Sequence, residues 1–343
     1  MKGARGWLAP VAGISAGWIA FCVLVWLYGE SPRDLAPELL HGTWGTSYGI
    51  GQVLFKATPI LVTGIAVDLA LRGGLFNIGA EGQLAVASVV AASVGARLPA
   101  GTPLVLGVPL AMAAAMAAGA LWALPPAVMR ARLGTHEVIT TIMMNRVADG
   151  VVGFALGAGL AMKDTVRTPD VVAGARAPRL EVLADAFRGS AVSVAFPLAL
   201  LAVGAHAWSL RRTRFGRELS LIGMSPAPLA AEGVPVRRYM ARALLLSGAV
   251  AGGASVATVL GYKGYFEEGL GAGAGFGGVA VALLGRGSPI GLVAAALLFG
   301  TLQQGGLVLN GHVPKELMDV LQGVIVCAVA LSDARVRARL RLA

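Results

Sequence analysis

The stretch Gly74-Leu-Phe-Asn-Ile-Gly-Ala-Glu-Gly-Gln-Leu84 places a carboxylate, two carboxamides and three glycines inside an otherwise apolar region. A carboxylate at the centre of a membrane helix costs about 2.5–3.5 kcal/mol on insertion-derived scales, so Glu81 is not expected to face lipid. Each glycine costs a helix interior about 1 kcal/mol relative to alanine, so Gly74, Gly79 and Gly82 favour a break. Polar groups beside a breakable helix at membrane depth are typical of a transport pathway.

Asn77, Glu81, Leu84 and Ser88 follow the spacing i, i+4, i+7, i+11, which predicts that they share one helix face. Two interpretations are open. The stripe lines a solute path, or Glu81 caps an adjacent helix and bonds backbone amides that the break has freed.

A second polar stripe, Thr141, Asn145 and Asp149, has Arg146 as a partner for Asp149. Asp68 and Arg72 have the i, i+4 spacing of a structural ion pair. The candidate residues for the solute path or the helix break are polar and come from three apolar spans: Asn77, Glu81, Gln83, Ser88, Asn145 and Gln303.

The chain around these residues reads as membrane-spanning. Of its 343 residues 56% are hydrophobic and 13% charged, with a mean hydropathy of +0.74, whereas charged residues make up about 25% of soluble domains. The long apolar runs are 9–28, 50–71, 76–97, 103–129, 138–161, 192–210, 240–260 and 289–309, and two shorter ones are 276–285 and 316–331. Because about 20 residues cross a bilayer, we expect an all-α polytopic membrane protein, a single permease domain over 1–343, with about ten transmembrane helices.

The net charge of +10 fits this topology better than it fits a nucleic-acid partner. With both termini cytoplasmic and 9–28 as an uncleaved first span, most Lys and Arg residues fall on the inside, as the positive-inside rule requires. Residues 162–191 then form an external loop and 211–239 a cytoplasmic one. Spans 2–5 and 7–10 start from opposite sides and carry glycine-rich breaks at 73–82 and 269–278, which predicts an inverted repeat.

The cytoplasmic loop contains an amphipathic pattern. Phe215, Leu219 and Ile222 recur at helical spacing among arginines, with Gly223 expected just past the helix end. A second short helix is expected from Pro226, closed by Gly233. Either this basic helix lies on anionic lipid, or it is the docking element of a cytoplasmic partner that supplies energy.

Several catalytic chemistries lack their motifs. No Gly-x-x-x-x-Gly-Lys-Ser/Thr, His-Glu-x-x-His or Gly-x-Ser-x-Gly sequence occurs. Gly273-x-Gly275-x-x-Gly278 follows no strand, so it does not indicate a dinucleotide site. Cys22 and Cys327 have neither disulfide nor metal spacing. The sequence predicts neither an enzyme nor a metal site.

Four segments carry a family resemblance: Gly74–Leu84, Thr135-His-Glu-Val-Ile-Thr-Thr-Ile-Met-Met-Asn145, Arg214-Phe-Gly-x6-Gly223 and Gly275-Phe-Gly-Gly-Val-Ala-Val-Ala-Leu-Leu-Gly285. They resemble the inner-membrane permeases of bacterial ABC importers for nucleosides, monosaccharides and branched-chain amino acids. The first two segments resemble the nucleoside-type branch in particular. One departure is His136, where the family often has Asn before the glutamate.

The resemblance implies a multi-pass permease of the bacterial cytoplasmic (inner) membrane. Its implied partners are a second, homologous permease, an extracytoplasmic solute-binding lipoprotein and an ATPase with two nucleotide-binding domains. That ATPase uses ATP and Mg, and this chain binds no cofactor. The implied coupling residues lie in one loop: Arg214, Phe215, Gly216, Leu219, Gly223 and Gly233.

The implied solute is a nucleoside or a similar small polar molecule, with a sugar or riboflavin as alternatives. Whether the permease pairs with itself or with a paralogue is open. The competing class is an ion-coupled secondary transporter, in which Glu81 or Asp149 would carry the coupling proton or ion.

Overall fold

The computed structural model describes residues 8–182 and 185–332, and these residues are largely helical. Within those two ranges the only extended pairings are isolated bridges, Arg167 with Glu267 and Arg179 with Ser193. The chain divides into two compact units. One comprises residues up to 57 together with those from 297 onward, and the other comprises residues 58–296.

The smaller unit contains α1 (Leu8–Leu27), α2 (Pro32–Thr43), the start of α3 (Ser47–Arg72), the end of α13 (Pro289–Val308) and α14 (Glu316–Ser332). α1 packs along α14. A Cβ on Gly17 would lie 2.7 Å from Cγ1 of Ile325, so the glycine permits this close approach. α2 lies between the first two long apolar runs of the sequence, and Pro32 at its first position with Asp34 in its first turn favours that helix start.

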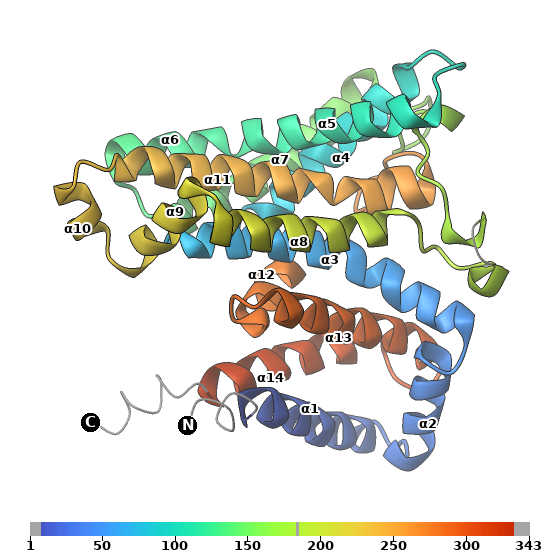
Figure 1. Cartoon of the computed structure of the whole chain (residues 1–343). Coiled ribbons are helices and arrows are strands. Elements are labelled where there is room, and N and C mark those ends of the chain that lie inside the picture. The colour runs from blue at the N-terminus through green and yellow to red at the C-terminus, as the bar shows by residue number, and fades with distance from the viewer. Residues whose placement is uncertain (1–7, 183–184, 333–343) are drawn as a thin grey trace. The chain divides into compact units, whose positions relative to one another are not determined.

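The larger unit holds the remaining long helices: α4 (Ala80–Arg97), α5 (Leu104–Trp122), α6 (Leu124–Leu133), α7 (Glu137–Ala155), α8 (Ala195–Arg212), α9 (Arg214–Met224), α10 (Pro226–Ala231), α11 (Val236–Gly253) and α12 (Ala274–Gly285). α5 lies beside both α4 and α11 (Figure 1). Gly119 of α5 and Gly248 of α11 face each other's backbone, and a Cβ on either would collide with the other's carbonyl. Small residues at a crossing let two membrane helices approach closely.

Five helices in the described ranges are long and apolar enough to cross a membrane: Ser47–Arg72, Leu104–Leu133, Glu137–Leu160, Val236–Lys263 and Pro289–Val308. Ser15–Leu27 and Ala274–Gly285 are shorter apolar helices. These helices confirm the all-helical, polytopic class. The number of spans and the side of each terminus stay predictions.

The helix boundaries depart from the apolar runs in two places that affect the site. The run 76–97 becomes a helix only from Ala80, because its first residues form a turn. The run 103–129 is divided between α5 and α6 at Ala123, and Pro125 and Pro126 lie directly after the division. Between α7 and α8, the described residues of 162–191 form a loop with short 3-10 turns, and its position outside the membrane stays a prediction.

Candidate functional site

Glu81 lies in the first turn of α4, and its carboxylate caps α12. Gly273 donates its backbone N–H to Oε1 at 2.6 Å, and Gly275 and Phe276 donate theirs to Oε2 at 2.7 and 3.4 Å. The first turn of any helix leaves N–H groups without an intrahelical partner, and a carboxylate satisfies them well. Glu81 therefore holds backbone amides, as the second interpretation of the sequence stripe predicted.

The two helices that Glu81 joins both begin at this point. A Cβ on Gly275 would collide with the backbone nitrogen and Cα of Glu81, so the first turns of α4 and α12 are in contact. Gly271 and Gly273, which precede α12, have φ of +82° and +86°, a region that favours glycine. The negative carboxylate between two positive helix ends offsets the repulsion of their dipoles.

Asn77 lies in the turn before α4, so its predicted place on a helix face with Glu81 and Ser88 is wrong. Its Oδ1 accepts the N–H of Gly79 at 2.9 Å, a local bond that favours a turn over a helix. Its Nδ2 donates to Oε1 of Gln83 at 2.9 Å and to Oγ of Ser247 on α11 at 2.8 Å. Ser247 in turn donates to the carbonyl of Ala66 on α3 at 2.6 Å. This buried network ties the turn to α3, α4 and α11.

Residues of α7 hold the other freed backbone groups of the turn. Asn145 accepts the N–H of Gly82 at 2.9 Å and donates to the carbonyl of Ile78 at 3.0 Å. Glu137 accepts the N–H of Phe76 at 3.2 Å and pairs with Arg130 at 3.4 Å. The signature Gly74–Leu84 and the segment Thr135–Asn145 thus form one structure, in which the second supplies hydrogen bonds to the backbone of the first.

The remaining predicted path residues, Ser88 and Gln303, are not part of this network, and neither is Asp149 of the second polar stripe. Ser88 is fully buried, and its hydroxyl has no hydrogen-bond partner among the described residues. Gln303 lies half-buried on α13, in the part of that helix that belongs to the smaller unit. Asp149 is 63% exposed and pairs with Arg146 at 3.5 Å, the partner expected from spacing.

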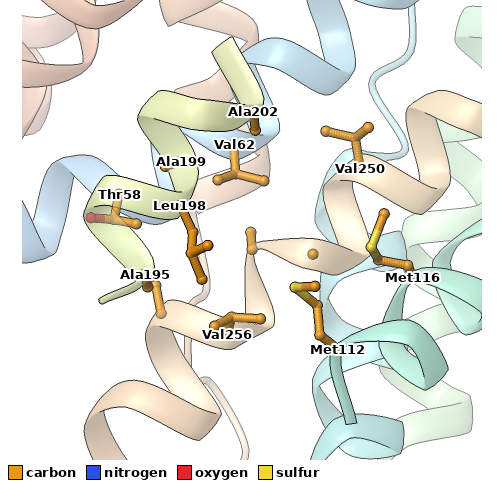
Figure 2. Close-up of a pocket in the computed structure, with 13 residues that line it drawn as sticks. Thr58, Val62, Met112, Met116, Ala195, Leu198, Ala199, Ala202, Val250 and Val256 are labelled. Carbon is orange, nitrogen blue, oxygen red and sulfur yellow. The ribbon is translucent and has the colours of Figure 1, made fainter. Parts of the chain in front are cut away.

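A polar cavity of about 220 Å³ opens beside the meeting point of the two helices. Its walls include Glu81, Asp149 and Glu268, together with the backbone of Gly269–Ala272. A second cavity of similar volume lies between α3, α5, α8 and α11 (Figure 2). Its walls are almost wholly apolar, with Met112, Met116, Leu198 and Val256 around it. Of these two cavities, the first offers more groups that hydrogen-bond a polar solute, and a third cavity of about 250 Å³ lies beside the Asp68–His206 contact.

The loop predicted at 211–239 folds into two short helices, α9 and α10, beside the ends of α8 and α11 (Figure 1). Thr213 caps α9 by accepting the N–H of Gly216 at 3.0 Å. Leu219 and Ile222 are buried, and Leu219 packs in a cluster with Leu69, Leu75 and Leu244. Because the apolar face of α9 is covered by protein, it is not available to lie on lipid.

The glycines of this loop fix α9 against its neighbours. Gly223 lies in the last turn of α9 and not past its end, and a Cβ there would collide with the carbonyl of Arg72. Gly216 lies against the carbonyl of Ser209 in the same way. Gly233, with φ of +80°, follows α10 as expected.

Polar contacts at the start of α9 fix its orientation to α11. Arg214 donates to Glu218 at 2.6 Å, and Phe215 stacks on Tyr239 with ring centroids 5.4 Å apart. Hydrogen bonds from the Tyr239 hydroxyl and the Arg214 guanidinium hold the pKa of Glu218 below its usual value. The predicted coupling residues therefore mostly position the loop.

The side of α9 that faces away from the protein carries the apolar residues that sequence reasoning missed. Leu221 is 50% exposed and Met224 is 82% exposed, and Pro226–Pro228 beside them are exposed too. The sequence alone could have indicated this exposed apolar surface, because Leu221 and Met224 fall outside the helical stripe of Phe215, Leu219 and Ile222. This surface has room for a partner.

A buried charge network links α3 to α8, which leads into α9. Asp68 accepts from Arg72 at 3.2 Å, the pair expected from spacing. It also lies 2.7 Å from Nε2 of His206 on α8, and Arg72 donates to the carbonyl of Gly287. His206 lies 138 positions from Asp68 in the chain, and no spacing pattern predicts their contact.

Residues 49–330 match the family described as "Branched-chain amino acid transport system / permease component". This chain belongs to that family. It is a multi-pass permease subunit of an ABC transporter in the cytoplasmic (inner) membrane, and such permeases work with ATPase and binding-protein partners.

Individual relatives cover nearly the whole chain. The guanosine ABC transporter permease protein NupP of Bacillus subtilis (strain 168) is 35% identical over 95% of this chain and 94% of its own length. The nucleoside ABC transporter permease protein NupB of Lactococcus lactis subsp. cremoris (strain MG1363) is 29% identical over 94% and 90%. The guanosine permease protein NupQ, also of B. subtilis, is 26% identical over 74% and 80%. No solved structure matches the chain.

The role of Glu81 as a cap predicts how its variants behave. We expect Glu81→Ala to lower the free energy of unfolding by about 1.5–3 kcal/mol, because it leaves three amides without their charged acceptor. Glu81→Gln keeps one acceptor oxygen and should lose less. Thermal unfolding of the purified permease in detergent measures both. The control is Glu268→Gln, an exposed carboxylate of the same cavity, which should unfold as the wild type does. Equal unfolding midpoints for all four proteins would contradict the cap.

Proposed function

We propose that this chain forms the translocation path of an ABC importer for nucleosides. The observation that carries the proposal is the 35% identity to a guanosine permease over 95% of the chain, together with 29% identity to a nucleoside permease over 94%. The 35% identity to the guanosine permease exceeds the 30% identity to a glucose permease of Haloferax volcanii and the 25% identity to a probable riboflavin permease of Treponema pallidum, which favours a nucleoside over a sugar or riboflavin.

The cavity beside Glu81 supports a polar solute, because the carboxylates of Glu81, Asp149 and Glu268 on its walls accept hydrogen bonds from hydroxyl and amino groups. Its backbone groups at Gly269–Ala272 offer donors and acceptors to hydroxyls and to a base, and Leu84 and Val152 supply apolar surface. Of the residues predicted for the path, we propose that Glu81 borders the solute, together with Asp149 of the second polar stripe. Asn77, Gln83 and Asn145, which are buried in the hydrogen-bond network, keep the helix break in shape.

We further propose that α9 and α10 couple the permease to an ATPase with two nucleotide-binding domains, which uses ATP and Mg while this chain binds no cofactor. The exposed apolar side of α9 supports this role. Since α9 is packed against α3 and α11, a push on it is transmitted to those helices. An extracytoplasmic lipoprotein delivers the solute on the opposite side.

The second permease subunit is proposed to be a paralogue of this chain. B. subtilis holds two guanosine permease proteins, and this chain is 35% identical to one and 26% identical to the other. A chain that resembles one member of such a pair more than the other is expected to need the second member as its partner.

The proposed topology has ten spans, both termini in the cytoplasm and an inverted repeat. The contact between the first turns of α4 and α12 supports the repeat, since each helix follows one of the two glycine-rich breaks. Half-helices whose N-termini face a central site are a recurring feature of inverted-repeat transporters.

The solute assignment predicts the outcome of reconstitution with the ATPase, the second permease and the lipoprotein. We expect ATP-dependent uptake of radiolabelled guanosine into proteoliposomes, reduced at least tenfold by excess unlabelled nucleosides and unchanged by excess glucose or riboflavin. Uptake that persists without ATP and stops on addition of an uncoupler would instead indicate an ion-coupled transporter. ATP-dependent uptake of glucose alone would contradict the solute.

The coupling assignment predicts the effect of charge on the exposed side of α9. Leu221→Asp with Met224→Asp should reduce co-purification of the ATPase at least tenfold and abolish ATP-dependent uptake, because two carboxylates would be buried in the contact. Leu133→Asp is the control, a leucine at the end of α6 whose 73% exposure lies between those of Leu221 and Met224. Normal ATPase binding by the double variant would show that α9 is not the docking element.

A further inference from the structure

One face of α7 carries a row of exposed residues at the spacing of a helix–helix contact. Met143, Arg146, Gly150 and Gly153 recur at intervals of three, four and three residues, the spacing of a seam between two packed helices. All four are exposed in this chain. We call this row of four residues the α7 seam.

Arg146 of the α7 seam and its partner Asp149 are charged residues at a membrane depth where contact with lipid is unfavourable. The span that contains it runs from Glu137 to Leu160. At 1.5 Å per residue, Arg146 and Asp149 lie about 14 and 18 Å from its start, near the middle of a bilayer about 30 Å thick. Their side chains are 83% and 63% exposed. A charged side chain facing lipid at this depth costs about 2.5–3.5 kcal/mol.

Two other long apolar helices of the larger unit avoid this cost. In Leu104–Leu133 the charges are Arg130 and Arg132, close to one end, and in Val236–Lys263 the exposed arginines lie within the first two turns. The Arg146–Asp149 pair is thus the exception among them. A face that stays charged at mid-depth must be covered by protein or by a water-filled path.

The glycines of the α7 seam indicate what kind of molecule covers this face of the helix. A Cβ on Gly150 or Gly153 would meet no atom within 4 Å, and the same holds for Gly157 one turn further along. Most helix glycines between α4, α5 and α11 touch a neighbouring helix, as Gly82, Gly119 and Gly248 do. Open glycines four residues apart, such as Gly153 and Gly157, allow a second helix to approach closely.

We propose that the α7 seam is the contact surface for the second permease subunit and that the occupant is a transmembrane helix of that paralogue. This rests on the proposed function, which requires such a subunit. A lipid would leave the Arg146–Asp149 ion pair without a further polar partner. The solute-binding lipoprotein binds outside the membrane, so it does not reach mid-membrane depth. A polar transmembrane helix of a related permease satisfies both the charge and the close approach.

The same contact would complete the polar cavity. Asp149 belongs both to the wall of that cavity and to the ion pair beside the α7 seam. A helix seated on the α7 seam would therefore close the cavity on this side, so that the solute contacts Glu81 and Asp149 of this chain together with residues of the partner.

Photo-crosslinking in the assembled transporter tests the surface. Benzoylphenylalanine is placed at Met143 or Gly150, and the matched controls are Val105 on α5 and Leu201 on α8, which are 76% and 69% exposed. Irradiation should join the α7 variants, and neither control, to the second permease. An adduct with lipid alone, with the lipoprotein or with a second copy of this chain would overturn the proposal, as would no adduct.

A substitution separates assembly from folding. Gly153→Leu should reduce co-purification of the second permease at least tenfold while the permease alone unfolds at its usual temperature, because no atom of the chain opposes the new side chain. Gly204→Leu on α8, an exposed glycine with equally open space, should change neither quantity. Full assembly of the Gly153→Leu variant would overturn the proposal. A failure of guanosine uptake with the crosslink intact would instead count against the solute.

Discussion

The arrangement depends on one carboxylate placed between two helix ends. Glu81 belongs to the first turn of α4 and accepts hydrogen bonds from Gly273 and Gly275 at the start of α12. Breaking two membrane helices exposes backbone amides that lipid cannot satisfy. The carboxylate satisfies those of α12, and the amides of Asn77 and Asn145 satisfy those of the turn before α4. The break is therefore a fixed structure, and the polar cavity beside it keeps its shape.

The polar residues of the membrane-spanning region are of two kinds. Asn77, Gln83 and Asn145 are buried and bonded to one another or to backbone, so they maintain the fold. Asp149 is exposed and borders the cavity, and its ion-pair partner among the described residues is Arg146. A buried network that is already satisfied has little to offer a ligand, whereas an exposed carboxylate at the cavity wall keeps acceptor capacity for one.

Much of the fold class and of the polar signature could be predicted from the sequence, because long apolar runs and helical spacing are local signals. The capping of a neighbouring helix by Glu81 was one of two stated interpretations, but the identity of that helix was not predictable, as Gly273 lies 192 residues away. Asn77 was placed on a helix wrongly, because a side-chain bond to Gly79 competes with helix formation. His206 and the open face of α7 became visible only with tertiary structure.

The most direct test of the central contact is hydrogen exchange of the backbone amides at 273–276, compared between the wild type and Glu81→Gln in the assembled transporter. If the carboxylate holds α12, these amides exchange slowly in the wild type and at least tenfold faster in the variant, while amides of α9 are unchanged. Equal protection of 273–276 in both proteins would show that Glu81 does not hold the two helices together.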